Sequence, residues 1–365
     1  MYGAQLVQAL RRRDPSLEFF GVGGQRMRDA GCETVVDARD LAVVGITEIL
    51  RHLPSIYGLY HKLIAEAERR RPDLAVVIDS PAFNWRVARQ MNKRGIPVVY
   101  YVAPQFWAWR QGRVKLLRKY VSKALVIFPF EEKFYRDRGV DATFVGHPLA
   151  GLPLPAITRE AFAAQYRINA GKQWITLMPG SRVKEVRMNL PTILEAASLL
   201  GADFEFLLPV APTLDREFLA ARTNGRGITL VTEALAALVH SRAGIVASGT
   251  ATVEAALMST PFVMVYRVSA LTYALGKPRI KVPHFAMVNL IAGEQVVPEL
   301  VQQDFAADKV AAGLKEIIPD GPSRSAMLEG LGRVRTRLRT PAAADSGSAA
   351  ERAAGSILAL LARPC

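Results

Sequence analysis

Short runs rich in Val, Ile and Phe alternate along the chain with segments whose apolar residues recur at helical spacing. Parallel strands need a long crossover between them, so this alternation predicts an α/β fold with parallel sheets wrapped in helices. The predicted strands of the first half are Glu18–Val22, Leu74–Asp79, Val98–Ala103, Leu125–Phe128 and Thr143–Val145. Those of the second half are Trp174–Met178, Phe204–Leu208, Ile228–Val231, Gly244–Ala247 and Phe262–Val265.

Two such series predict two Rossmann-like domains that face each other across a cleft, and 365 residues are enough for each domain to bury its own core. The stretch Gly151–Thr158 is interpreted as the linker, which gives domains at 1–150 and 151–335. Residues 336–365 comprise a small, polar segment (Thr340–Ser348) that is expected to be flexible, and a helix (Ala349–Ala362) that is expected to return to the first domain. Other predicted helices include Gln111–Lys123, Val183–Leu200 and Thr252–Met258.

The chain carries 47 basic and 33 acidic residues, a formal net charge of +14, which favours a polyanion or an anionic bilayer as partner. A nucleic-acid-binding protein would show a dense basic stripe or a recognisable module, and the sequence has neither. No apolar run reaches the roughly 18 residues of a spanning helix, and the two cysteines fit a reducing cytosol. The cations form short clusters, each typical of a solvated face when taken alone, at Arg11–Arg13, Arg69–Arg71, Arg110–Lys123 and Lys277–Lys281.

Residues 41–60 combine an apolar stripe at helical spacing with nearby cations. Pro54 is expected to interrupt the helix. Together with the basic clusters, this segment is interpreted as a membrane-docking element, although a stripe that packs on the core of the first domain would give the same pattern. The stripe consists of Ile46, Ile49, Leu50, Leu53, Tyr57 and Tyr60.

Two strand ends in the second half are candidate anion sites. One strand leads into Pro179-Gly180-Ser181-Arg182, and another leads into Ser248-Gly249-Thr250 before a helix that carries Glu254. Backbone N–H groups and a helix N-terminus at a sheet edge attract anions, and Arg182 adds a charge suited to phosphate. An ordinary strand–helix turn would look the same at either place, but two such turns in one domain favour a phosphate site.

Motifs for several other chemistries are missing from the sequence. The chain has no Walker-type Gly-Lys-Ser/Thr loop and no Asp-x-Asp pair, and its five histidines show no ligand spacing. A metal-bound diphosphate is therefore disfavoured, and neither a metal nor a cofactor is expected. Arginine and helix dipoles would then have to neutralise a phosphate leaving group.

The first domain offers a candidate base and an aromatic block. Asp79 ends a predicted strand, where its carboxylate could accept a proton from an alcohol or could equally cap the next helix. After the following strand the chain continues Pro-Gln-Phe-Trp-Ala-Trp-Arg over residues 104–110. These aromatic side chains could pack against a sugar or an acyl chain, or they could belong to the core.

These motifs together resemble the lipid A disaccharide synthase family over nearly the whole chain. The tryptophan-rich block is the most specific of them, and the order and spacing of all the blocks support the match. The matching blocks are VGGQRM (22–27), LAVVGITEIL (41–50), VVIDSPAFN (76–84), YYVAPQFWAWRQGRV (100–114), FPFEEKFY (128–135), VGHPL (145–149), LMPGSR (177–182), ASGTATVEAAL (247–257), VNLIAG (288–293) and VVPELVQ (296–302).

The resemblance implies a GT-B fold and an inverting, metal-independent glycosyl transfer. The family moves a 2,3-diacylglucosamine unit from UDP to the 6-hydroxyl of 2,3-diacylglucosamine 1-phosphate (lipid X) and releases UDP, with Asp79 as the expected base. The acceptor side would comprise Asn84, Gln105, Trp109, Arg110 and His147. The donor side would comprise Arg182, Ser248, Gly249, Thr250, Glu254, Arg267 and Asn289.

The same resemblance implies a cytoplasmic protein of a Gram-negative cell, peripheral on the anionic inner face of the inner membrane, and leaves a homodimer open. Many members have a second acidic residue where this chain has Ala82, which concentrates the expected base on Asp79. Members also begin with an apolar strand and a Gly-Glu-x-Ser-Gly-Asp type of loop, and the chain is expected to lack both. The alternatives are a truncated, catalytically impaired remnant and another GT-B enzyme that uses a UDP-sugar.

Overall fold

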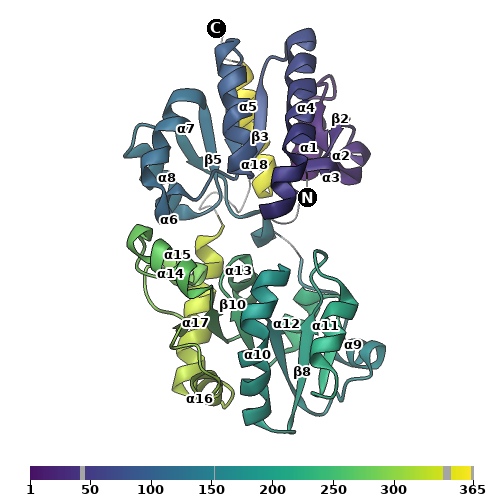
Figure 1. The fold of residues 1–365 in the computed structure, drawn as a ribbon, viewed down its shortest axis with the longest axis vertical. Helices are drawn as coiled ribbons and strands as arrows, with labels where there is room; N and C mark the ends of the chain where they lie inside the picture. Colours follow the sequence, from purple (N-terminus) through teal and green to yellow (C-terminus); the bar gives the residue numbers. More distant parts are fainter. Residues whose placement is uncertain (42–45, 152, 340–346, 363–365) are drawn as a thin grey trace. The chain divides into compact units, whose positions relative to one another are not determined.

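The computed structural model describes residues 1–41, 46–151, 153–339 and 347–362, and it describes residues 41 and 46–55 by their backbone alone. The chain divides into two compact units, residues 1–151 with 339–365 (unit 1) and residues 152–338 (unit 2), each coloured by sequence in Figure 1. Among the described residues, no helix combines the length and the hydrophobicity that crossing a bilayer requires.

The described part of unit 1 contains two parallel sheets, β1-β2 and β3-β4-β5-β6, the second with its strands in chain order. Its strands are β1 (Phe20–Gly23), β2 (Glu33–Asp37), β3 (Ala75–Ile78), β4 (Val98–Tyr101), β5 (Lys123–Val126) and β6 (Ala142–Phe144). Its helices are α1 (Tyr2–Arg13), α2 (Gln25–Asp29), α3 (Ala38–Leu41), α4 (Ile46–Arg70), α5 (Pro81–Lys93), α6 (Phe106–Trp109), η1 (Gln111–Arg113), α7 (Val114–Tyr120), α8 (Pro129–Arg136), η2 (Pro148–Gly151) and α18 (Ala349–Leu361).

The four-stranded sheet has its carboxyl ends along one edge because all its strands run in the same direction. Strand β4 is buried at every position, which explains why it reads as a continuous apolar run with no alternation. The core cluster beside it includes Val77, Val98 and Tyr100. The segments that follow each strand at the carboxyl edge therefore lie next to one another.

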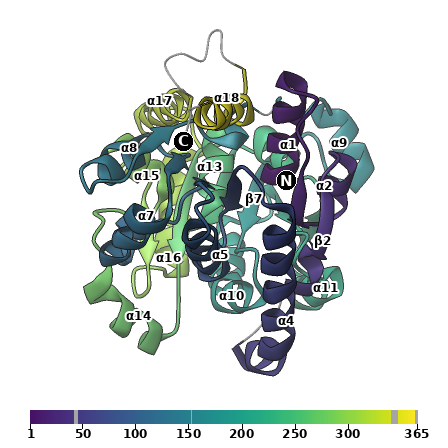
Figure 2. The ribbon, with the colours of Figure 1, turned by 90° about the horizontal axis from the view of Figure 1, so that it is seen from above.

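The C-terminal helix α18 packs against α1 in unit 1, as predicted (Figures 1 and 2). Glu351 accepts hydrogen bonds from Arg12 and Arg13, and Arg352 donates to the carbonyl of Val145 at 2.8 Å. Two arginines of the first basic cluster are thus engaged in ion pairs within the unit. Most of the segment 340–348 lies outside the described residues.

The predicted strands of unit 1 are all present within a few residues, but β1 pairs with β2, a strand absent from the prediction. The predicted helix Gln111–Lys123 ends at Tyr120, because Lys123 already begins β5. The predicted interruption at Pro54 is wrong, since the backbone of α4 is helical from Ile46 to Arg70.

Unit 2 is built on one six-stranded parallel sheet in the order β9-β8-β7-β10-β11-β12. Its strands are β7 (Gln173–Met178), β8 (Phe204–Pro209), β9 (Ile228–Val231), β10 (Ala243–Ala247), β11 (Phe262–Tyr266) and β12 (Glu299–Val301). Its helices are α9 (Arg159–Tyr166), α10 (Val183–Leu200), α11 (Arg216–Thr223), α12 (Ala234–His240), α13 (Thr250–Leu257), α14 (Ala270–Gly276), η3 (Lys277–Arg279), α15 (Met287–Ala292), α16 (Ala307–Ile317) and α17 (Pro322–Arg337).

The order of these strands is that of a doubly wound nucleotide-binding sheet. Chain order runs outward from β7 to β9 on one side, and it resumes at β10 on the other side of β7. The carboxyl ends of β7 and β10 therefore flank the point at which the winding direction reverses, and ligands of such sheets bind there. The strand β12 is absent from the sequence prediction, whereas the bounds of β9 and α10 agree with it.

Candidate active site

The backbone that carries Asp79 takes an unusual conformation at the end of β3. Asp79 and Ser80 have φ angles of 49° and 42°, in the left-handed region that non-glycine residues seldom enter. Such residues cost about 1–3 kcal/mol each and persist only where their surroundings hold them. The carbonyl of Asp79 accepts hydrogen bonds from the Tyr100 hydroxyl at 2.6 Å and from the Asn84 amide at 2.6 Å. These two bonds hold the turn, and they leave the Asp79 side chain exposed.

The carboxylate of Asp79 does not cap the next helix. The N-cap of α5 is Ser80, and no side chain caps this N-terminus. Within the described residues, the Asp79 carboxylate makes no hydrogen bond to the first turn of α5. Its exposed position at the carboxyl edge is therefore compatible with proton transfer to or from a ligand.

Asn84 occupies a different place from the one expected. Its side chain is buried, and its amide also donates to the carbonyl of Ile78 at 2.8 Å. The amide therefore binds two successive carbonyls where β3 leaves the sheet, because these carbonyls have lost their strand partners. The Asn84 amide nitrogen thus holds the backbone beneath Asp79.

The tryptophan-rich block divides into a buried part and an exposed part. Trp107 is buried and donates its indole N–H to Glu131 at 2.8 Å. Glu131 is fully buried at the start of α8, where it also accepts the backbone N–H groups of Ile127 at 3.1 Å and Phe128 at 3.0 Å. Burial raises the pKa of Glu131 to about 7. Sequence reasoning missed this carboxylate, although an acid in the first turn of a helix is a recognisable capping pattern.

The exposed part of the block is a cation resting on an aromatic ring. The guanidinium of Arg110 lies 3.9 Å from the ring centre of Trp109, which is 47% exposed. Gln105 is exposed at the start of α6. Core packing therefore accounts for Trp107, while Gln105, Trp109 and Arg110 remain accessible at the carboxyl edge.

His147 lies under the surface beyond the end of β6. It is 3% exposed, and burial lowers its pKa to about 4, so the ring is neutral at neutral pH. The ring Nδ1 accepts the backbone N–H of Leu149 at 3.2 Å, which puts the proton on Nε2. The ring also packs against Phe128, with 5.3 Å between the centres.

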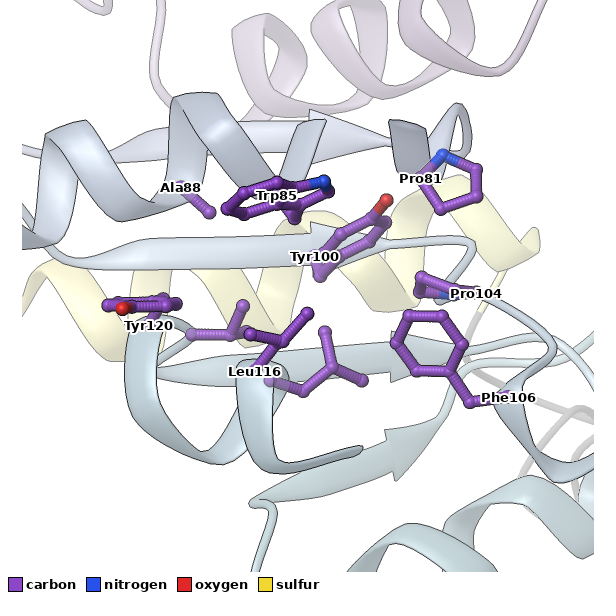
Figure 3. A pocket seen from close by; sticks show the side chains of 10 residues that line it. Pro81, Trp85, Ala88, Tyr100, Pro104, Phe106, Leu116 and Tyr120 are labelled. Atoms are coloured by element: carbon purple, nitrogen blue, oxygen red, sulfur yellow. The ribbon is translucent and has the colours of Figure 1, made fainter. Parts of the chain in front are cut away.

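A narrow apolar slot runs beside this site, between α5 and α7 (Figure 3). Its side chains nearly close it, since the cavity volume is only ≈ 10 Å³. Tyr100 forms its floor, and the hydroxyl of Tyr100 points toward the end of the slot that holds Pro81. The walls are Pro81, Trp85, Ala88, Pro104, Phe106, Leu116, Leu117, Tyr120 and Val121.

In unit 2, Glu185 fixes the loop that follows β7. Its carboxylate accepts the backbone N–H groups of Ser181 at 2.9 Å and Arg182 at 3.3 Å, and it pairs with the Arg182 guanidinium at 2.6 Å. The Arg182 side chain is 79% exposed. Gly180 has a φ of 122°, which a residue with a side chain rarely adopts. The loop thus presents a basic side chain on a rigid turn at the switch point.

The loop after β10 lies on the other side of the switch point, since β10 pairs directly with β7. Gly249 precedes α13 with a φ of 133°, and Thr250 is exposed. The Ser248 hydroxyl donates to the carbonyl of Phe285 at 2.8 Å. Glu254 is partly buried on α13, and burial raises its pKa.

Two residues expected on the donor side are used inside unit 2. Asn289 is fully buried: its amide donates to Val297 and Glu299, and its oxygen accepts the backbone N–H groups of residues 296 and 297. Arg267 donates to the Thr192 hydroxyl at 2.7 Å and to the carbonyl of Phe305. These contacts support the loops of unit 2.

Comparisons with known proteins agree with this arrangement. A family model described as lipid-A-disaccharide synthetase matches residues 1–347. A relative from Koribacter versatilis, named lipid-A-disaccharide synthase, is 53% identical over 100% of this chain and 96% of its own. A relative of the same name from Acidobacterium capsulatum is 50% identical over 93% of this chain and 89% of its own.

Among solved structures, the glycotransferase of kitacinnamycin is similar with a TM-score of 0.65 at 17% identity, over 98% of this chain and 96% of that one. This likeness concerns the fold alone and confirms two Rossmann-like units of the GT-B kind. The match to the family model spans nearly the whole chain, and the two relatives are 53% and 50% identical over the aligned residues. The chain therefore belongs to the lipid-A-disaccharide synthetase family.

Proposed function

We propose that this chain is an inverting glycosyltransferase that joins UDP-2,3-diacylglucosamine to lipid X and releases UDP. Its family membership and the name of its relatives, lipid-A-disaccharide synthase, support this reaction. The observation that carries the proposal is Asp79, an exposed carboxylate on a turn that Asn84 and Tyr100 hold in a strained conformation.

In the proposed reaction Asp79 accepts the proton of the acceptor 6-hydroxyl as that oxygen attacks C1 of the donor sugar. The new C–O bond forms on the face opposite the diphosphate, the bond from C1 to the diphosphate oxygen breaks, and its electron pair leaves with UDP. The configuration at C1 is thereby inverted. A positioned general base contributes about 10²–10⁴-fold in rate, and rigid placement by Asn84 and Tyr100 makes that contribution available without rearrangement.

Unit 1 takes the acceptor in this proposal. Lipid X is an anion with two acyl chains, and the exposed Arg110 on Trp109 offers a cation together with an aromatic surface. The apolar slot of Figure 3 begins at Pro81, next to the Asp79–Ser80 turn, and its apolar side chains would have to move apart to admit one acyl chain.

Unit 2 takes the donor. Arg182 and the backbone N–H groups at the start of α13 lie at the carboxyl ends of β7 and β10, where a diphosphate would meet positive charge and hydrogen-bond donors. Glu254, one turn further along α13, would accept hydrogen bonds from the ribose hydroxyls. The proposal includes neither a metal nor another cofactor.

The proposed substrates carry acyl chains, so the reaction belongs at a membrane surface, which we place at the anionic, cytoplasmic face of the inner membrane. The docking positions expected for α4 are Ile46, Ile49, Leu50 and Leu53, whose side chains lie outside the described residues. Tyr57, the next position of the stripe, is 65% exposed, and Tyr60 packs against Phe83 with 6.0 Å between ring centres. Of the two described side chains of the stripe, Tyr60 thus packs on the core and Tyr57 is exposed.

The test is a transferase assay with both lipid substrates in detergent, in which the disaccharide is identified by mass spectrometry and UDP by chromatography. We expect both products from the wild-type chain. Asp79→Asn should lower turnover by at least about 100-fold and keep UDP affinity, whereas Asp73→Asn, an exposed aspartate just before β3, should behave as wild type. Turnover above a tenth of the wild-type value in Asp79→Asn would remove Asp79 as the base, and UDP-sugar epimerisation without disaccharide would refute the reaction.

A further inference from the structure

Helix α14 of unit 2, green in Figure 1, leaves large apolar side chains in solvent. Leu271 is 70% exposed and Leu275 is 56% exposed, and no residue of the helix is buried. The two leucines are four positions apart, so they lie on the same face. Among the large apolar side chains that are exposed in the described part of the chain, no other two stand within two turns of each other on one helix. The pair forms an apolar face that nothing in unit 2 covers.

Three cations follow this face directly, namely Lys277, Arg279 and Lys281, and all three are exposed. The Lys277 ammonium lies 5.6 Å from the ring centre of Tyr273, and Arg279 donates to the carbonyl of Leu275. Within the described residues, none of the three pairs with an acidic side chain.

The first two basic clusters differ in part. Arg12 and Arg13 share Glu351, and Arg70 pairs with Glu33 and Glu66. Part of their charge is thus compensated inside unit 1. The cluster at 277–281 therefore combines uncompensated positive charge with an adjoining apolar face, a combination that the first two basic clusters lack.

We propose that α14 and residues 277–281 form a second membrane-contact surface, here called the α14 surface, that binds anionic lipid headgroups. Leu271 and Leu275 enter the boundary between headgroups and acyl chains, while the three cations contact the phosphates, as in interfacial amphipathic helices. The inference rests on the proposed function only in assuming that the protein acts at a bilayer surface. It assigns a membrane contact to unit 2, in addition to the one proposed for α4 in unit 1.

Charge complementarity favours a bilayer over a second copy of the chain. A symmetric contact between two copies would set one α14 surface on another, and residues 270–281 contain no acidic side chain that could pair with Lys277, Arg279 and Lys281. An anionic bilayer supplies the opposite charge and an apolar layer in the same geometry. The net charge of +14 acts in the same direction.

The experiment measures binding of the full chain to vesicles of phosphatidylcholine with 3 parts in 10 phosphatidylglycerol, and to vesicles of phosphatidylcholine alone, by co-sedimentation. One variant carries Leu271→Ser and Leu275→Ser, and its matched control is Leu199→Ser, a leucine on α10 that is 54% exposed. A second variant carries Lys277→Gln, Arg279→Gln and Lys281→Gln. Its matched control neutralises three exposed cations elsewhere in unit 2, with Arg187→Gln, Arg226→Gln and Lys315→Gln.

Each basic side chain near an anionic surface strengthens binding about fivefold, so we expect the glutamine variant to lose at least tenfold on anionic vesicles and almost nothing on neutral ones. The serine variant should lose several-fold on anionic vesicles. Both controls should stay within twofold of wild type. A third variant, with Ile49→Ser, Leu50→Ser and Leu53→Ser in α4, should lose binding independently, so its effect should multiply with that of the α14 variants.

Wild-type vesicle binding by both α14 variants would overturn the proposal. So would a serine variant that changes only the sedimentation equilibrium of the chain, because the α14 surface would then be a contact between copies. Transferase activity in detergent should remain at the wild-type level in both variants. A chain that binds vesicles as expected but forms no disaccharide would refute the proposed function and leave the α14 surface intact.

Discussion

Glu131 combines complete burial with three N–H donors, and its replacement by glutamine therefore has a definite expected result. Glutamine keeps the size of the side chain but offers a single acceptor oxygen. That oxygen can serve the backbone N–H groups of Ile127 and Phe128, or the indole of Trp107, but not both. The protonated carboxyl of the wild type can serve all three, so Glu131→Gln should cost about 1–3 kcal/mol for one unsatisfied N–H at pH 5.

The pH dependence follows from the raised pKa. The carboxyl ionises near pH 4.5 in the unfolded chain but keeps its proton to about pH 7 in the folded chain. The folded state therefore binds more protons between these values, and the free energy of unfolding falls as pH rises through the window. The full difference of the two pKa values corresponds to about 3 kcal/mol. The glutamine variant lacks this titration, so its loss of unfolding free energy relative to the wild type should shrink by about 3 kcal/mol between pH 4.5 and pH 8. At pH 8 the two proteins should be equally stable, or the variant should be the more stable one.

Urea unfolding followed by tryptophan fluorescence measures this difference for unit 1, which contains Trp85, Trp107 and Trp109. Trp107→Phe, alone and combined with Glu131→Gln, completes a double-mutant cycle that isolates the indole bond from the loss of ring volume. A deficit of Glu131→Gln that is constant from pH 5 to pH 8, or that grows with pH, would refute the reasoning. A coupling energy near zero between positions 107 and 131 would show that Glu131→Gln does not act by losing the hydrogen bond from the Trp107 indole.

Two further predictions concern the candidate site. Asn84→Ala should lower kcat at least tenfold and change KM little, because it releases the turn under Asp79 while touching no substrate. The control is Asn92→Ala, at the exposed end of α5. A wild-type kcat in Asn84→Ala would mean that the turn holds without Asn84. Arg182→Ala and Glu254→Ala should each weaken UDP binding about tenfold in calorimetry with EDTA present, since a charge-assisted contact is worth about 1.5–3 kcal/mol. Arg187→Ala is the control on the same helix, and loss of wild-type binding on addition of EDTA would contradict the metal-free account.

The sequence predicted most strands of the two larger sheets well because the central strands are largely buried. A buried parallel strand reads as an uninterrupted apolar run, as in β4 and β10. The two strands that escaped prediction lack this signal. The first and last residues of β2, Glu33 and Asp37, carry charged side chains. Strand β12 has only three residues, and all of them are partly buried.

The loops that form the candidate site could be predicted from the sequence, but the contacts of each residue in them could not. Strand ends at a carboxyl edge are visible in the sequence, and Asp79 and the turn at Arg182 lie at such ends. Whether an asparagine nearby faces a ligand or a carbonyl depends on which backbone groups lose their partners at that edge. Asn84 and Asn289 bind such groups, and no local pattern distinguishes them from asparagines that contact a substrate.

In both units, polar side chains of the following helix hold the loops at the strand ends. Where a strand ends, its last peptide groups leave the sheet, and a polar side chain from the first or second turn of the next helix binds them: Asn84 binds carbonyls, while Glu131 and Glu185 bind N–H groups. The loops thus present Asp79 and Arg182 at the surface, and Glu185 also pairs with the Arg182 guanidinium. Such a scaffold fixes charged groups before a ligand arrives, which is the condition under which electrostatic stabilisation of a transition state is largest. Substitutions beneath the loops should therefore impair turnover, although they remove no group that meets the substrate.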